Sequence, residues 1–423
     1  MSISLLRQID QHEIYFNQRE PEVLAFLPES GRFERLRREA QHLKDRYPHA
    51  GLRPPFYGAL LGVKDIIHVE GFPTRAGSQL PPHVLQGPQA DCVTRLREAG
   101  ALILGKTETS EFAYTSPTPT RNPHHPGHTP GGSSSGSAAA VAAGLCSLAL
   151  GTQTTGSLIR PAAFCGVVGF KPSYDRISRS GVVPLAPSID HVGFFTSNVA
   201  GATLAASLLC SDWRSTGSVQ RKPLLGIPEG PYLRRVSREG RAHFETVCRH
   251  LVMQGCKVKA VPAMSDFEAI AARHNLLLTG EAALVHAEWY AGYGDRYRPE
   301  TAELIRCGQM VPPAALQCAR DGCEELRAEL AALMDAHNLD VWLSPPAVGP
   351  APRGLSGTGD AIMNLPWTHS GLPALTLPVG KNAAGLPLGL QVAARWYADE
   401  ELLAWSAVLE EVLSRFANCQ RLG

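Results

Sequence analysis

The sequence predicts an α/β protein in which helices surround a largely buried sheet. Helical and strand patterns alternate along most of the chain, and the strand patterns are short, continuous apolar runs. Such runs are typical of strands that are covered on both faces. No linker or internal repeat divides the 423 residues, so we expect one domain over residues 1–423.

The expected elements follow in chain order. Apolar spacings of three and four predict helices in the first fifty residues, and the β-rich run GALLGVKDIIHV follows. A helix from Asp91 to Gly100 precedes a strand over 101–106, and TETSEFA predicts a helix over 107–113 with Thr107 as its N-cap. Later helices are expected over 137–144, 239–255, 274–290, 312–337 and 398–416, and later strands over 145–151, 223–227, 256–261, 340–346, 372–380 and 386–394.

Composition excludes several classes of function. The formal net charge of +1 gives no reason to expect a nucleic-acid partner. The N-terminal segment is polar, and no run approaches the roughly 20 apolar residues of a membrane span. We therefore expect a cytoplasmic protein without a membrane partner.

The cysteines and histidines give no sign of a metal site. None of the ten cysteines lies in a C-x-x-C pair, and several lie in apolar runs, so we expect free, buried thiols, although a cysteine nucleophile stays open. HHPGH (124–128) has metal-like spacing but lacks a nearby cysteine or acid, so we interpret it as a surface loop. We expect neither a metal nor another cofactor.

A Gly/Ser/Thr-rich stretch over 129–173 carries the strongest chemical signal. It places one small-residue turn at Ser133 and another at Ser157, on either side of an Ala-rich segment, and Lys64 lies upstream between apolar neighbours. A serine hydrolase without histidine needs an accessible nucleophile, free backbone N–H groups for an oxyanion and a base that loses its proton near neutral pH. A desolvated lysine is such a base.

These segments resemble the amidase signature family, the Ser–cisSer–Lys amidohydrolases. The resemblance implies a single domain with a mixed, twisted sheet core inside α-helices. Within it we expect N-terminal helices over 1–50, a catalytic core over 58–200, a variable substrate-pocket region over 210–336 and C-terminal strands with a helix over 340–423. The blocks that carry it are 58–78, 100–113, 129–173, 178–193 and 364–394.

The resemblance implies a role for each of three residues. Ser157 is the nucleophile, Lys64 is the base, and Ser133 bridges them after a cis peptide bond at Gly132–Ser133. Each has a simpler interpretation: Ser157 caps a helix, Ser133 is a turn serine, and Lys64 pairs with its neighbour Asp65 or is a surface lysine whose amine reaches solvent. The oxyanion hole is expected at the backbone N–H groups of Thr154, Thr155, Gly156 and Ser157.

Further residues are expected to bind substrate or support the network. GTQTTGSLIRPAA resembles the malonamidase branch, in which the arginine corresponding to Arg160 holds a substrate carboxylate, so we assign Arg160 and Thr152 to substrate binding. The alternative is that Arg160 braces backbone carbonyls. Ser134 is expected at the substrate site or in its supporting network, unless it is solvated.

Two other positions bear on the family comparison. Gln153 stands where many family members have Asp, which weakens the interpretation as the glutaminase subunit of a tRNA amidotransferase. The Asp190–His191 pair is interpreted as structural.

The expected function is hydrolysis of a small carboxamide through an acyl-Ser157 intermediate, with release of ammonia or an amine. The resemblance also implies a homodimer, which is common among the apparent relatives. Three alternatives stay open: an amidotransferase A-type subunit, a non-catalytic binding protein that keeps the fold, and a G-x-S-x-G nucleophile at Ser134, which would require a preceding strand.

Overall fold

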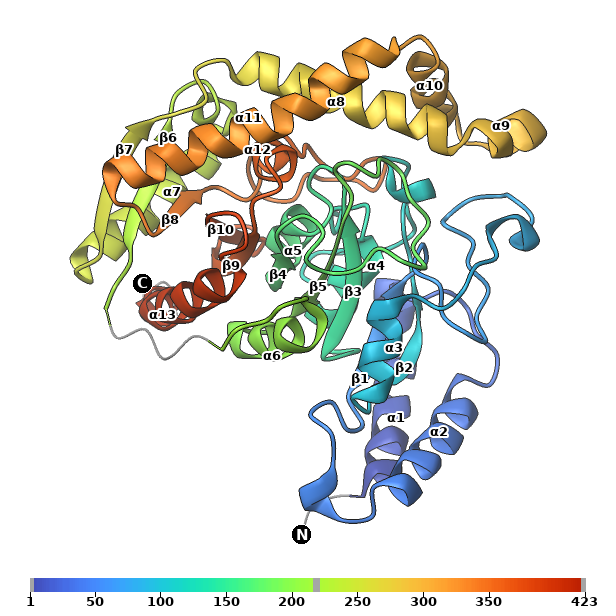
Figure 1. Cartoon of the computed structure of the whole chain (residues 1–423). Helices are drawn as coiled ribbons and strands as arrows, with labels where there is room; N and C mark the ends of the chain where they lie inside the picture. Colours follow the sequence, from blue (N-terminus) through green and yellow to red (C-terminus); the bar gives the residue numbers. More distant parts are fainter. Residues whose placement is uncertain (1–3, 216–220, 420–423) are drawn as a thin grey trace.

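A ten-stranded mixed sheet forms the centre of the structure, a computed structural model that describes residues 4–215 and 221–419 (Figure 1). The strand order is β2-β1-β3-β5-β4-β9-β10-β8-β6-β7. The predicted α/β class with a mixed sheet is therefore confirmed. The strands are β1 (Leu60–Lys64), β2 (Leu102–Thr107), β3 (Leu148–Gln153), β4 (Val168–Lys171), β5 (His191–Thr196), β6 (Leu224–Glu229), β7 (Lys257–Pro262), β8 (Val341–Ser344), β9 (Ala374–Lys381) and β10 (Pro387–Ala393).

The directions of the strands determine which strand ends lie at the same edge of the sheet. β1 pairs in parallel with both β2 and β3, so Lys64, Thr107 and Gln153, which end these strands, lie at one edge of the sheet. Antiparallel pairs run from β3 through β5, β4, β9 and β10 to β8, and β8 is parallel to β6 and β7. The carboxyl ends of β6, β7 and β8 therefore lie at the opposite edge.

Helices cover both faces of the sheet. The α-helices are α1 (Leu5–Val23), α2 (Arg32–Arg46), α3 (Asp91–Glu98), α4 (Ser135–Ala142), α5 (Ile159–Cys165), α6 (Val199–Leu209), α7 (Arg238–Met253), α8 (Phe267–Val285), α9 (Ala287–Tyr293), α10 (Pro299–Gly308), α11 (Pro313–His337), α12 (Leu365–His369) and α13 (Asp399–Cys419). Successive residues of β2 alternate between two hydrophobic clusters: Ile103 belongs to the cluster that includes residues of α3, α6 and α13, whereas Leu102 and Leu104 belong to the cluster that includes residues of α1, α2 and α4.

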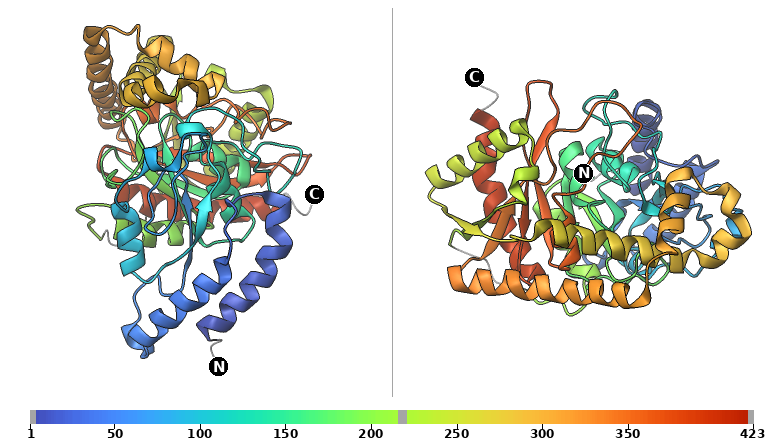
Figure 2. Two further views of the ribbon diagram at one scale, coloured as in Figure 1. Left: turned by 90° about the vertical axis from the view of Figure 1, so that its right-hand side faces the viewer. Right: turned by 90° about the horizontal axis from the view of Figure 1, so that it is seen from above.

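The helices α8–α11 form a layer on one side of the molecule, and α1 and α2 project on the other side (Figures 1 and 2). α8 packs beside α10, α11 and α12. This layer comes from the region in which the sequence carried no family pattern, and α8 brings Asn275 and Leu278 to the candidate site. Within the described ranges, no helix is both long and apolar enough to cross a bilayer.

One expected helix was wrong, and another is interrupted at a single residue. Residues 107–113 do not form a helix: Thr107 ends β2, and only a 3-10 turn over Glu111–Ala113 follows. The backbone N–H of Glu108 donates to Ala25, the N–H of Ser110 donates to Ser133, and Phe112 has a left-handed φ of 46°. Tertiary hydrogen bonds thus replace the helical ones that Thr107 was expected to cap.

The helix expected over 274–290 is present but is divided in two. The structure begins α8 earlier, at Phe267, and interrupts the helical run at His286 before α9. The apolar spacing on both sides of His286 is helical, so the pattern alone did not mark the break.

Candidate active site

Lys64 ends β1 inside the protein and contacts Ser133. Its side chain is fully buried, and its Nζ donates to Ser133 Oγ and to Thr152 Oγ1, both at 2.8 Å. Burial lowers the pKa of Lys64 well below its ordinary value of 10.5, against a smaller opposing effect of Asp190. A neutral amine beside a serine hydroxyl is the arrangement that a lysine base requires.

The alternative pairing of Lys64 with Asp65 was wrong. Asp65 forms a buried ion pair with Lys106, with 2.8 Å between Asp65 Oδ1 and Lys106 Nζ. Its Oδ2 accepts the backbone N–H of Arg75. Asp65 therefore does not hold a proton on Lys64 through a direct contact.

Ser133 and Ser134 lie in the loop that leads into α4. The Gly132–Ser133 peptide bond is cis, as the resemblance implied. Ser134 is fully buried: its Oγ donates to the carbonyl of Thr152 at 3.1 Å and accepts the Thr152 N–H at 3.3 Å. The solvated interpretation of Ser134 was therefore wrong, since this hydroxyl ties the serine loop to β3.

Ser157 lies in the turn between β3 and α5, as expected. Its side chain is 7% exposed and lines a cavity of about 310 Å³. Thr154, Thr155, Gly156 and Arg160 line the same cavity. The backbone N–H groups of Thr155, Gly156 and Ser157 have no acceptor among the residues that the structure describes, which leaves them free to bind an oxyanion.

The structure does not join the two serine hydroxyls by a hydrogen bond. No bond of that kind is present between Ser133 and Ser157 within the described chain, so the second contact of the expected relay stays a prediction. A side chain nevertheless connects the segments that carry the two serines. Arg160 lies one turn after Ser157, and its Nη2 donates to the carbonyl of Gly132, next to Ser133, at 2.7 Å. Catalytic hydrogen bonds are often longer without substrate than in the reacting complex.

Arg160 makes the contacts of a bracing residue. Besides Gly132, it donates to the carbonyl of Gly359 at 2.9 Å and to Thr358 Oγ1 at 3.1 Å. Burial lowers the pKa of Arg160 to about 10, and the carboxylate of Asp360 at the cavity opposes that shift. The guanidinium therefore stays charged at neutral pH and fastens both the serine loop and the 358–359 segment.

Thr152 contacts Lys64, and no hydrogen bond joins it to Arg160 within the described residues. Its hydroxyl accepts from Lys64, and the residue lines a cavity of about 50 Å³ that shares Thr154 with the cavity that Ser157 lines. Thr154 Oγ1 donates to Asp190 at 2.5 Å, and Asp190 also accepts the N–H groups of Leu185 and Ala186. Asp190 thus fixes the start of the Ser157 turn.

Close packing at Gly156 involves a residue for which the sequence gave no individual signal. A β-carbon built on Gly156 would lie 2.3 Å from Asn364 Oδ1, so a side chain cannot fit there. Asn364 is held by bonds from its Nδ2 to Pro346 O and Gln391 Oε1, both at 2.9 Å. Asn364 starts the C-terminal block that carried the resemblance, and that was the available signal.

His274 and Thr368 are further neighbours that sequence reasoning missed. His274 Nε2 lies 3.1 Å from Thr155 Oγ1, and burial lowers the pKa of this histidine well below 6.5. Thr368 Oγ1 donates to the carbonyl of Thr155 at 2.6 Å. Nothing in the sequence around His274 indicated this contact, because α8 lies in the region without a family pattern.

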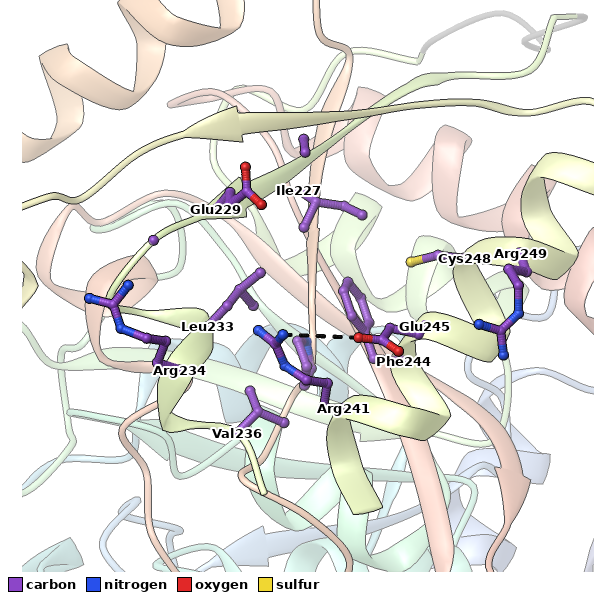
Figure 3. Close-up of a pocket in the computed structure, with 13 residues that line it drawn as sticks. Ile227, Glu229, Leu233, Arg234, Val236, Arg241, Phe244, Glu245, Cys248 and Arg249 are labelled. Carbon is purple, nitrogen blue, oxygen red and sulfur yellow. Dashed lines mark ion pairs between the residues drawn. The ribbon is translucent and has the colours of Figure 1, made fainter. Parts of the chain in front are cut away.

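A larger cavity, of about 690 Å³, lies elsewhere, between α7 and the strands β6 and β7 (Figure 3). Arg241 and Glu245, one turn apart on α7, both line it and form an ion pair at 4.0 Å. Its lining contains no serine, and burial raises the pKa of the Cys248 thiol to about 12, so that sulfur is protonated at neutral pH. This cavity therefore lacks the nucleophile and base found near Lys64.

The remaining histidine and cysteine positions are as follows. His124 Nε2 lies 2.8 Å from the carbonyl of Cys165. Across the described residues, no three His, Cys, Asp or Glu side chains are grouped in a way that could hold a metal ion. The cysteines at 307 and 318 are exposed, whereas those at 92, 146, 165, 210, 248, 256 and 323 are buried and free.

Known proteins are similar to this chain in both sequence and fold. Residues 30–403 match the model of the Amidase family. The A-type subunit of the glutamyl-tRNA(Gln) amidotransferase of Thermus thermophilus is 34% identical over 430 residues, which cover 90% of this chain and 89% of that protein.

Two solved structures extend the comparison. The crystal structure of an amidase matches with a TM-score of 0.88 and 32% identity, covering 97% of this chain and 96% of the other. The peptide amidase of Stenotrophomonas maltophilia matches with a TM-score of 0.79 and 26% identity, covering 97% and 93%. The chain therefore belongs to the amidase signature family and is an amidase, a hydrolase that acts on C–N bonds.

Proposed function

We propose that the protein hydrolyses a small carboxamide through an acyl enzyme on Ser157, with Ser133 and Lys64 as its proton relay. The observation that carries this proposal is the buried Lys64 Nζ, 2.8 Å from Ser133 Oγ, at the same edge of the sheet as the Ser157 cavity. A buried lysine in contact with a serine is otherwise costly, because burial disfavours its charged form.

In the proposed reaction, neutral Lys64 takes the proton of Ser133, which takes the proton of Ser157. Ser157 Oγ then attacks the amide carbon, and the relay returns a proton to the departing nitrogen. Water releases the acid from the acyl enzyme by the same route. Thr152 supports this role because it accepts one N–H of Lys64 and so directs the amine towards Ser133.

The oxyanion is proposed to form at the backbone N–H groups of the turn, for which we assign Thr154, Thr155, Gly156 and Ser157. The free N–H groups of the last three support the assignment. Each such donor contributes about 3–4 kcal/mol to the transition state. Ser134 is proposed to support the turn through Thr152 and not to touch substrate, since its hydroxyl is used by the backbone.

For the substrate, we propose a small amide that carries a carboxylate, such as a malonamate-like or urea-derived acid. A cavity of about 310 Å³ suits a small molecule, and the charged Arg160 lines it. The bracing contacts of Arg160 support a different role, so the two roles need separating. Arg160→Lys should raise the KM of acidic amides more than that of neutral amides if the arginine binds a carboxylate, and should lower both rates equally if it only braces.

A glutaminase role, as part of an amidotransferase, is the second candidate. The similarity to the A-type subunit of an amidotransferase favours it. Ammonia release from glutamine would support this role, and release from other amides alone would exclude it. We further propose a cytoplasmic homodimer, which light scattering of the purified chain and cell fractionation would test.

The experiment that tests the function is an ammonia-release screen over acidic and neutral small amides, with the Ser157→Ala variant beside the native chain. Activity that requires Ser157 supports the proposal. A folded native chain that releases no ammonia or amine from any amide would instead favour a binding protein with this fold.

A further inference from the structure

The Gln153 carboxamide holds the end of the turn that carries Ser157. Gln153 ends β3, is fully buried, and its Oε1 accepts the N–H groups of Leu158 at 2.8 Å and Ile159 at 3.0 Å. Leu158 is the N-cap of α5 and Ile159 is its first residue, and backbone N–H groups at this end of a helix have no partner within the helix. A single oxygen thus closes the five-residue turn from 154 to 158.

The other end of the same amide reaches α12. Gln153 Nε2 donates to Thr368 Oγ1 at 2.9 Å. Thr368 has one hydroxyl proton, and its Oγ1 lies 2.6 Å from the carbonyl of Thr155 and 3.2 Å from that of Asn364, so the carbonyl of Thr155 is the nearer acceptor. The orientation of the Gln153 amide is fixed, since a flipped amide would point its NH₂ group at the N–H groups of Leu158 and Ile159.

We propose that Gln153 is a positioning residue whose amide donor sets the direction of the Thr368 hydroxyl, and that this clamp aims the N–H groups of residues 155–157 into the cavity. The proposal rests on the proposed function of that turn. Oε1 holds the helical end of the turn, and Nε2, acting through Thr368, holds the carbonyl of Thr155. The two ends of one side chain therefore fix a segment whose own N–H groups stay free for the substrate.

A carboxylate at this position separates the two halves of the clamp. In Gln153→Glu the oxygen acceptor for Leu158 and Ile159 remains, but the donor to Thr368 is lost. The Thr368 hydroxyl then donates to the new carboxylate, and the carbonyl of Thr155 loses its partner. Because this variant also places a carboxyl group at a fully buried position, Thr368→Val, which adds no charge, tests the same bond independently.

The test compares Gln153→Glu and Thr368→Val with Thr368→Ser, which keeps the hydroxyl. Ser370→Ala is the matched control: this buried hydroxyl ends the same helix, but it donates to the carbonyl of Pro366 and does not touch the turn. The readouts are kcat and KM for an amide, the rate at which a fluorophosphonate labels Ser157, the unfolding midpoint, and hydrogen exchange of the peptide that contains residues 154–159.

We expect Gln153→Glu and Thr368→Val to lower kcat and the labelling rate about 10- to 100-fold with little change in KM, and to speed exchange in 154–159. Thr368→Ser and Ser370→Ala should stay near the native values. The double variant Gln153→Glu/Thr368→Val should be no slower than Thr368→Val, because both changes release the same carbonyl.

Native kcat, labelling and exchange in Gln153→Glu would overturn the clamp and leave the proposed function intact. Equal losses in Ser370→Ala would also overturn it. Conversely, a native chain that is not labelled at Ser157 would contradict the proposed function, while the exchange of residues 154–159 would still decide whether the amide holds the turn.

Discussion

The Nζ of Lys64 lies 2.8 Å from the Oγ of Ser133, although 69 positions separate the two residues in the chain. Lys64 reaches this place because β1 ends there, and Ser133 reaches it because its loop leads into α4, which packs against β1 and β3. The contact is completely buried. Burial lowers the pKa of this amine, and a neutral amine beside a hydroxyl supports the proposed role of Lys64 as the base.

Removal of this amine should abolish activity and stabilise the fold. Lys64→Met should lower turnover by about four orders of magnitude or more, as loss of a residue in a concerted relay does. The same variant should unfold at a higher temperature at neutral pH, because no amine has to be buried without its proton.

Lys171 offers the matched control for that variant. It is also fully buried, and burial lowers its pKa to about 7, but its Nζ donates to the carbonyls of Pro172 and Leu372 and not to a serine. Lys171→Met should therefore keep the Ser157 labelling that Lys64→Met loses. Turnover in Lys64→Met close to that of the native chain would refute the role of Lys64.

The pH dependence follows from the sign of the Lys64 shift. Only the neutral amine is a base, so kcat/KM should rise with pH through the lowered pKa of Lys64, well below 10.5. Between that pKa and 10.5 the unfolded chain binds one proton more at Lys64 than the folded chain does, so the free energy of unfolding rises with pH. The stability gained in Lys64→Met should accordingly shrink as the pH approaches 10.5, which denaturant titrations at several pH values would measure. An advantage that grows with pH would contradict the account.

Gly156→Ala should damage the turn without changing any charged group. Its new methyl group would lie 2.3 Å from Asn364 Oδ1, and the Asn364 side chain is held through its Nδ2 by Pro346 and Gln391, so the turn must move. A loss of one oxyanion donor lowers kcat by about 100- to 1,000-fold, and we expect a fall of that order. Gly292→Ala in α9, where no atom lies within 4 Å of the added carbon, is the control. Unchanged kcat in Gly156→Ala would remove the turn from the oxyanion site.

Thr152→Val distinguishes the two roles considered for Thr152. If the hydroxyl orients Lys64, kcat should fall about tenfold for acidic and neutral amides alike, because Nζ loses one of its two partners. If Thr152 helps to hold a substrate carboxylate, as the sequence suggested, the KM of acidic amides alone should rise. Steady-state kinetics on one amide of each kind decides between them.

The sequence predicted those features of the candidate site that depend on residues adjacent in the chain. The turn around Ser157 and its position before a helix follow from the small residues of this segment and from Pro161. The contact of Lys64 with Ser133 was available only through the family resemblance, because spacing alone cannot say which strands end together. Thr107 shows the opposite case: its local pattern is that of a helix cap, but bonds from Glu108 and Ser110 to distant segments decide the structure.

Other contacts could not be foreseen because they join segments that share no pattern. His274 reaches Thr155 from α8, and Gln153 reaches Thr368 from 215 residues away. For Arg160 the sequence left carboxylate binding and backbone bracing open. The structure adds the bracing contacts to Gly132 and Gly359, and it leaves the binding of a carboxylate to experiment.

Peptide mapping of the native chain after reaction with a fluorophosphonate, with Lys64→Met treated in parallel, tests the roles of Ser157 and Lys64 together. We expect one adduct, on Ser157, and none in the lysine variant. An adduct on Ser134 or another serine, or equal labelling of Ser157 without Lys64, would contradict these roles.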